Sequence, residues 1–274
     1  MDTATTAWDD QIRKIVSGGG RVSPRGFATT EIRRSLVEFD SRAPVVVDPL
    51  RKLSWKFLSG EALWILSGSD RLEEIAPYNE KMRQYSDDGL TLWGAYGPRV
   101  HAQLDGAIAR LVLDPDSRQA VVSLWRENPP PDTRDVPCTL ALHFSIRSEA
   151  LDTLALMRSS DAWLGLPYDM FCFTMIGWRV VAEISSRGRR LRPGRTTIFA
   201  HSSHIYDEHI EKARTIMRAP YDADEAAVID RMIDSTTLPR DSRALTSGEN
   251  FRELVMCELA LARDENRPPR FSEL

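Results

Sequence analysis

The sequence predicts one domain of mixed α and β structure, of the α+β class. Three observations lead to this prediction. Apolar and polar side chains alternate over residues 138–147, which is typical of a half-buried strand. Residues 168–184 are apolar nearly all round, which indicates a central buried helix. Residues 98–114 place their apolar side chains on one helical face, with Pro98 at the start.

The remaining elements follow from the same patterns. Trp8, Ile12 and Ile15 mark one face of a short helix, and the glycine-rich residues 17–26 predict a flexible loop. Further helices are predicted at residues 51–68, 98–114, 168–184 and 207–217. Strands are predicted at residues 29–40, 119–125, 138–147, 150–159 and 195–206. The proline-rich stretch 127–136 is interpreted as a surface excursion, so residues 1–274 are expected to form a single domain with a helical C-terminal portion.

Composition excludes several classes of protein. Apolar residues make up 42% of the chain, charged residues 28%, and the net charge is −4, which is ordinary for a soluble globular protein. No basic patch for nucleic acid or a membrane surface is evident, and no apolar run reaches the ~20 residues that span a bilayer. No signal peptide is visible, and three cysteines are too few for a disulfide framework, so a cytoplasmic protein is expected.

One cysteine and three arginines are candidates for chemistry. Cys138 follows Pro137 at the start of a strand, and is either a small buried side chain or a nucleophile that needs a partner. Arg25, Arg118 and Arg158 could together bind a phosphate through bidentate hydrogen bonds. The alternative is that these are three ordinary surface arginines.

The histidines leave two interpretations open. His201, His204 and His209 could bind zinc, but neither a cysteine nor a His-Glu-x-x-His pattern accompanies them, so no metal is expected. His204 and Tyr206 lie two residues apart and therefore share one face of a strand. Two such groups on one face would suit a sugar.

Six short motifs together resemble one known family. They are, in order, GEALWILSG, LWGAYG, DPDSRQAVVSLW, PCTLALHF, RSSDAWLGLPYD and SSHIYDEH. Each motif is weak alone, but the set, with its order and spacing, is similar to the thymidylate synthase family over roughly residues 25–217. The resemblance implies a mixed sheet packed by a long buried helix, and a homodimer formed through the sheet.

The resemblance also implies roles for individual residues. Cys138 matches the nucleophile that adds to C6 of a pyrimidine nucleotide, and Arg158 beside it would favour the reactive thiolate. The remaining matched residues are Arg25, Arg118, Arg158 and Ser159 for the phosphate, with Arg118 reaching the partner's site; His204 and Tyr206 for the sugar; Glu61 and Tyr96 for proton handling; and Asp161, Tyr78 and Trp64 for the folate. The one-carbon donor would be 5,10-methylenetetrahydrofolate.

Asp169 falls where the family places an asparagine that reads the uracil edge. Cytosine presents the opposite pattern, with an amino donor at C4 and an acceptor at N3. A carboxyl group complements that edge, because it accepts from the amino group and either donates to N3 or pairs with a protonated N3. The alternative is that Asp169 merely caps the helix that follows. Base reading is the interpretation adopted, and it indicates a cytidylate 5-hydroxymethylase.

Departures from the family pattern gather on the folate side. They are Gln119 for an arginine, Thr139 for a histidine, Met157 for a glutamine, Tyr78 for a tryptophan, and a C-terminus without the closing apolar tail. A wetter folate side favours water addition over hydride transfer, and so favours hydroxymethylation. The alternatives are a methylase acting on dUMP or dCMP and a non-catalytic member that binds a nucleotide or RNA. CMP is preferred over dCMP by analogy with hydroxymethylases of nucleoside-antibiotic biosynthesis.

Overall fold

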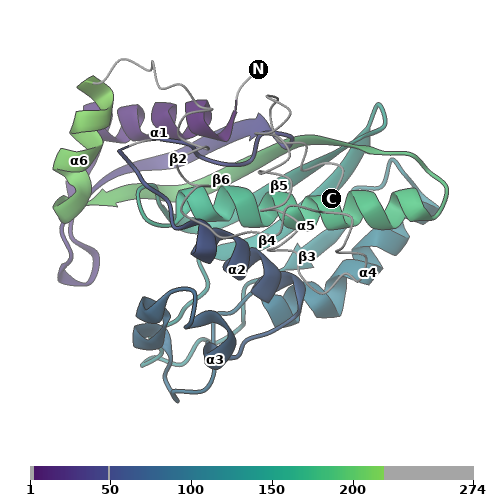
Figure 1. Ribbon diagram of the computed structural model, residues 1–274, viewed down its shortest axis with the longest axis horizontal. Coiled ribbons are helices and arrows are strands. Elements are labelled where there is room, and N and C mark those ends of the chain that lie inside the picture. Colours follow the sequence, from purple (N-terminus) through teal and green to yellow (C-terminus); the bar gives the residue numbers. More distant parts are fainter. Residues whose placement is uncertain (1–2, 49, 219–274) are drawn as a thin grey trace, which may run out of the picture.

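The computed structural model describes residues 3–48 and 50–218, which form a six-stranded sheet with helices packed against it (Figure 1). The strands are β1 (Gly20–Val22), β2 (Thr29–Asp40), β3 (Val121–Ser123), β4 (Thr139–Arg147), β5 (Ala150–Asp161) and β6 (Arg192–Tyr206). The α-helices are α1 (Ala4–Gly18), α2 (Trp55–Leu66), α3 (Leu72–Ile75), α4 (Gly97–Leu113), α5 (Leu166–Ser186) and α6 (Asp207–Arg218). Two 3-10 helices cover Pro24–Gly26 and Glu80–Tyr85. The predicted mixed α and β class is confirmed.

The long helix α5 organises the site because it joins the one parallel pair of strands in the described sheet. The strand order is β1-β2-β6-β5-β4-β3, and β5 pairs with β6 in parallel while the other neighbours are antiparallel. A parallel pair needs a crossover, which α5 supplies. A Cβ atom at Gly177 would lie 2.4 Å from Thr153 Oγ1, so glycine allows this close approach of helix and sheet.

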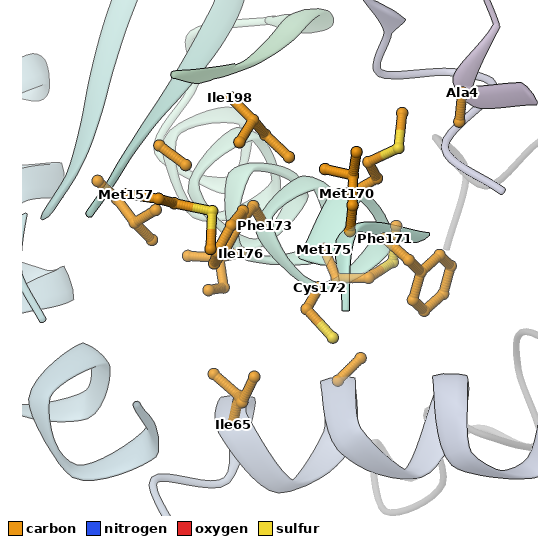
Figure 2. Close-up of a cluster of buried hydrophobic side chains, with 14 of the residues drawn as sticks. Ala4, Ile65, Met157, Met170, Phe171, Cys172, Phe173, Met175, Ile176 and Ile198 are labelled. Atoms are coloured by element: carbon orange, nitrogen blue, oxygen red, sulfur yellow. The ribbon is translucent and has the colours of Figure 1, made fainter. Parts of the chain in front are cut away.

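Helix α2 lies against α5, on the side away from the strands, as Figure 1 shows. It begins at Trp55 rather than at residue 51, because the Ser54 hydroxyl accepts a hydrogen bond from the Phe57 N–H at 3.2 Å and caps the helix. Figure 2 shows the apolar side chains of α5 that fill the space between the sheet and α2. The helix predicted at residues 168–184 is therefore confirmed as buried.

Two local predictions are wrong. Residues 17–26 were expected to be a loop, but they contain the edge strand β1, whose Gly20 pairs with Glu31, and a 3-10 turn. The alternation expected from Cys138 through Leu140 also fails, because Thr139 is buried and Leu140 is exposed. The cause is a β-bulge between Thr139 and Ala141, which shifts the pairing of β4 with β5 next to Cys138.

Several strand side chains remain exposed on the face of the sheet away from α5. Leu36 is 56% exposed and Val121 47%, whereas their neighbours Val37 and Val122 are buried. Within the described residues, no helix has the length and apolar character needed to cross a membrane. The helical C-terminal portion predicted after α6 and the third cysteine, Cys257, lie outside the described residues.

Candidate active site

Cys138 lies at the entrance to β4, within reach of the Arg158 guanidinium. Arg158 Nη2 is 3.7 Å from Cys138 Sγ, and Arg158 also donates to the carbonyl oxygens of Pro137 (2.8 Å) and Val136 (2.9 Å). The backbone N–H of Arg158 donates to the Cys138 carbonyl at 2.9 Å. Arg158 therefore fixes the segment that carries Cys138 through both its backbone and its side chain.

The Cys138 thiol keeps its proton to a higher pH than an ordinary cysteine does. Burial raises the pKa of Cys138 above its ordinary value, and this outweighs the lowering by Arg158. The carboxyl groups of Asp169 and Asp135 raise it further, while Arg25 lowers it. Arg158 thus favours the thiolate, as expected, but burial has the larger effect, and in the ligand-free protein the thiol dominates at neutral pH.

Asp169 lies in the first turn of α5, where it has no capping role. The N-cap is Gly165, whose carbonyl accepts from the backbone N–H groups of Tyr168 and Asp169. The alternative that the Asp169 side chain caps the helix is therefore wrong. Burial, with help from the nearby carboxylates of Glu61 and Asp161, raises the pKa of Asp169 well above its ordinary value. Its carboxyl group therefore keeps its proton to a higher pH than an ordinary aspartate does.

Glu61 projects from α2 toward the same region. Burial raises its pKa to about 7, and a hydrogen bond from the Cys172 thiol acts in the opposite direction. The Cys172 Sγ and Glu61 Oε2 atoms are 3.8 Å apart. A carboxyl group with such a pKa can both take and give a proton under physiological conditions.

Tyr96 is held near Cys138 by Thr139, the residue that follows it. Its hydroxyl oxygen accepts from the Thr139 hydroxyl at 2.9 Å and from the Thr139 N–H at 3.3 Å. Burial raises the pKa of Tyr96 well above its ordinary value. Thr139, noted above as a departure from the family pattern, therefore has a defined role in placing Tyr96.

The end of β5 and the end of β6 place Asp161, His204 and Tyr206 together. Asp161 pairs with His204 across the parallel ladder, and its carboxylate accepts from the N–H groups of Trp163 (2.9 Å) and Leu164 (2.8 Å). Burial lowers the pKa of His204, while Asp161 acts against this change. The rings of His204 and Tyr206 meet edge to face with centroids 5.1 Å apart, so the predicted shared face is confirmed.

The zinc interpretation gains no geometric support. His201 is exposed, and the His209 ring lies 6.1 Å from that of Trp163. Over residues 3–48 and 50–218, no cluster of three or more His, Cys, Asp or Glu side chains is arranged to hold a metal ion.

The four predicted phosphate residues separate into two groups. Arg25 is close enough to Cys138 and His204 to change the pKa of both, and Arg158 does the same. Ser159 follows Arg158 in β5 and lies opposite Ser202. Arg118 is exposed in the segment between α4 and β3, and no hydrogen bond or ion pair joins it to the others among the described residues. Gln119 beside it accepts from Arg110 at 3.0 Å.

The two aromatic residues expected on the folate side differ in placement. The Tyr78 ring lies directly against Gly60, where a Cβ atom would come within 2.4 Å of it, and so flanks Glu61. Trp64 is only 6% exposed, and its indole N–H donates to the Arg71 carbonyl at 3.2 Å. Tyr78 is thus available beside the site, whereas Trp64 packs within the core.

Two contributions were missed by the sequence analysis. Asp135 is largely buried and accepts from the Gly94 N–H at 2.8 Å, which ties the Tyr96 segment to the Cys138 segment. Arg51 lies over the rings of Trp163 and Tyr168 at 5.6 and 5.9 Å, beside the start of α5. Neither belongs to a recognised motif. The signal that could have found Asp135 is a lone acid three residues before the candidate nucleophile.

The chain is similar to known proteins over most of its length. A sequence model described as thymidylate synthase matches residues 6–238. The chain is also 27% identical over 259 residues to the deoxyuridylate hydroxymethyltransferase of Bacillus phage SP01, covering 82% of this chain and 64% of that protein. The chain therefore spans slightly less than two thirds of that relative's length.

Proposed function

Because this chain belongs to the thymidylate synthase family, we propose that it is a cytidylate 5-hydroxymethylase. It would transfer a one-carbon unit from 5,10-methylenetetrahydrofolate to C5 of CMP or dCMP and complete the product with water. The observation that carries the choice of base is the position of Asp169 in the first turn of α5, where burial raises the pKa of its carboxyl group well above the ordinary value. The hydroxymethyl product is supported by the name of the phage relative, which is a hydroxymethyltransferase.

Recognition of the pyrimidine base by Asp169 depends on whether its carboxyl group holds a proton. A neutral carboxyl group offers one acceptor oxygen and one O–H donor. In cytosine these meet the amino group at C4 and the ring nitrogen N3. N3 of cytosine is far more basic than the carbonyl oxygen of uracil, so an acidic proton is shared better with cytosine. No described residue donates a hydrogen bond to the Asp169 carboxyl group, which leaves both oxygens for the base.

The covalent step is assigned to Cys138. Its sulfur, after losing a proton, bonds to C6, and the electron pair of the C5–C6 double bond then makes C5 a nucleophile toward the one-carbon unit. Loss of the C5 proton, release of tetrahydrofolate, addition of water and departure of the sulfur restore the ring. Glu61 and Tyr96 are proposed to move these protons, because they converge beside Cys138 and Asp169.

The remaining residues are proposed to hold the two substrates. Arg25, Arg158 and Ser159 would bind the phosphate, and His204 with Tyr206 the sugar. The folate co-substrate supplies the carbon at the oxidation level of formaldehyde. The residues present fit it in two respects: Tyr78 flanks Glu61, and Asp161 lies near Asp169.

The phage relative supports one competing assignment. Its printed substrate is a deoxyuridylate, so a uridylate is the alternative substrate for this chain. Incubation with the folate and CMP, dCMP, UMP or dUMP in turn, followed by mass spectrometry, distinguishes the two. We expect a gain of CH₂O on a cytidylate. A preference for uridylates would contradict the base assignment, a gain of CH₂ would indicate a methylase, and no product would indicate a binding protein.

A homodimer is proposed to complete the phosphate site. The exposed strand residues Leu36 and Val121 supply an apolar face for a second copy, and Arg118 would reach the partner's phosphate. If so, Arg118→Ala and Cys138→Ala proteins, each inactive, should regain activity when refolded together. Because half of the dimers are mixed and each has one intact site, about a quarter of the wild-type activity is expected. Absence of any recovery, with mixed dimers detected by mass spectrometry, would contradict the role of Arg118.

A further inference from the structure

The Cys172 thiol lies near two partly buried carboxyl groups, those of Glu61 and Asp169. Asp169 and Cys172 are three residues apart on α5 and therefore share one face of the helix. Glu61 faces them from α2, with its Oε2 atom 3.8 Å from Cys172 Sγ. Cys172 is 3% exposed, and Figure 2 shows its side chain directed from α5 toward the helix that carries Ile65, which is α2.

We propose that Cys172 is a positioning residue, which donates its S–H to Glu61, holds that carboxyl group in place and keeps the proton of the carboxyl pair on Asp169. This inference rests on the proposed function, since it gives the two carboxyl groups different tasks. Asp169 needs its proton to pair with cytosine. Glu61 needs to lose and regain one to serve the transfer.

The physical basis is that two neighbouring carboxyl groups in a poorly solvated site ionise together only at a cost. A negative charge on Glu61 raises the pKa of Asp169, so a single proton is favoured on the pair, and small local differences decide where it stays. A donor at one member stabilises that member's carboxylate. The Cys172 thiol is such a donor to Glu61, and among the described residues no equivalent donor reaches the Asp169 carboxyl group.

The other titratable groups around Glu61 do not replace the thiol. Asp169, from α5, is an acid whose own pKa is raised by the Glu61 carboxylate, so it supplies no positive charge that would stabilise ionised Glu61. Tyr78, from the segment after α3, packs against the neighbouring Gly60, and Tyr96, at the start of α4, donates to neither carboxyl group in the described structure. Burial raises the pKa of Glu61, and the hydrogen bond from the Cys172 thiol acts to lower it.

The test compares Cys172→Val and Cys172→Ala, which lack a donor, with Cys172→Ser, which keeps one. In the ligand-free full chain, ¹³C NMR of labelled glutamate carboxyl carbons follows the titration, and Glu61→Gln assigns the signal. We expect the pKa of Glu61 to rise by roughly one unit in the valine and alanine variants, and to stay or fall in the serine variant. Thermal unfolding verifies that each variant is folded.

Two outcomes would overturn the inference: a wild-type pKa of Glu61 in both the valine and alanine variants, or a serine variant that behaves like them. Valine fills the site and alanine leaves space, so agreement between them excludes a packing effect. The pH at which kcat changes is expected to shift among the Cys172 variants in the same order as the pKa of Glu61. The inflection that belongs to Glu61 is the one that Glu61→Gln removes. If the titration changes as expected but no nucleotide yields product, the proposed function fails while the positioning role stands.

Discussion

Cys138→Ser is expected to abolish turnover, with kcat lowered by about 10⁴-fold or more, the scale seen when an enzyme loses its nucleophile. The serine hydroxyl is a far weaker nucleophile than a thiol, and the hydrogen bond from Arg158 at the sulfur position does not compensate for this. The measurement is single-turnover product formation under saturating nucleotide and folate. Release of the C5 hydrogen as tritium should disappear in parallel, because the bond from sulfur to C6 is what activates C5.

Nucleotide binding provides the control for this variant. Arg25, Arg158 and Asp169 are unchanged, so a nucleotide should raise the melting temperature of Cys138→Ser as much as that of the wild type. A variant that still formed product or released tritium would exclude the covalent step. Loss of both binding and turnover would show that the serine had disturbed the bulge at Thr139. Turnover by the Cys138→Ala variant would then test the covalent step.

The pH dependence of thiol reactivity follows from the same geometry. Because burial raises the pKa of Cys138, the thiolate fraction of the ligand-free enzyme is small at pH 7 and grows about tenfold per pH unit up to that pKa. Activation therefore depends on bound substrate and on a nearby base. Arg158 is engaged with two backbone carbonyls and only partly offsets the burial of the sulfur.

The elements that sequence could predict are those with a strong local period. The alternation in β4 beyond its bulge and the apolar character of α5 depend on side chains within each segment, and β4, β5 and α5 were all placed close to their observed bounds. The two-residue spacing on a strand also predicted that His204 and Tyr206 share a face. The bulge at Thr139 has no such local signal, since it arises from the pairing of β4 with β5.

The environment of the site could not be predicted in the same way. Glu61 and Cys172 are 111 positions apart in sequence and meet only because α2 packs on α5. The burial that raises the pKa values of Asp169, Cys138 and Glu61 is a property of that packing. Sequence could therefore name the chemical groups but not their protonation states. For Cys138, the charge of Arg158 lowers the pKa as expected, but burial, which the sequence did not predict, raises it by more.

Asp169→Asn should move the substrate preference from cytidylates toward uridylates, changing the ratio of kcat/KM values by about 10²- to 10⁴-fold. Asparagine keeps the size of the side chain but has no acidic proton to share with N3 of cytosine. Its amide can instead donate to O4 of uracil and accept from N3–H. The measurement is kcat/KM for CMP, dCMP, UMP and dUMP with the wild type and the variant, read as product by mass spectrometry.

Stability measurements separate a change of specificity from a loss of fold. The folded-state pKa of Asp169 is raised, so the wild type binds a proton that the unfolded chain releases, and this group costs stability as pH rises above its ordinary value of 3.8. The amide introduced by Asp169→Asn does not titrate, so the variant should be at least as stable as the wild type at neutral pH. Asp105→Asn, on an exposed face of α4, is the matched control and should leave both preference and stability unchanged. If Asp169→Asn kept the full preference for cytidylates while remaining folded, the base would have to be read by another group, and the neutral carboxyl would have no part in it.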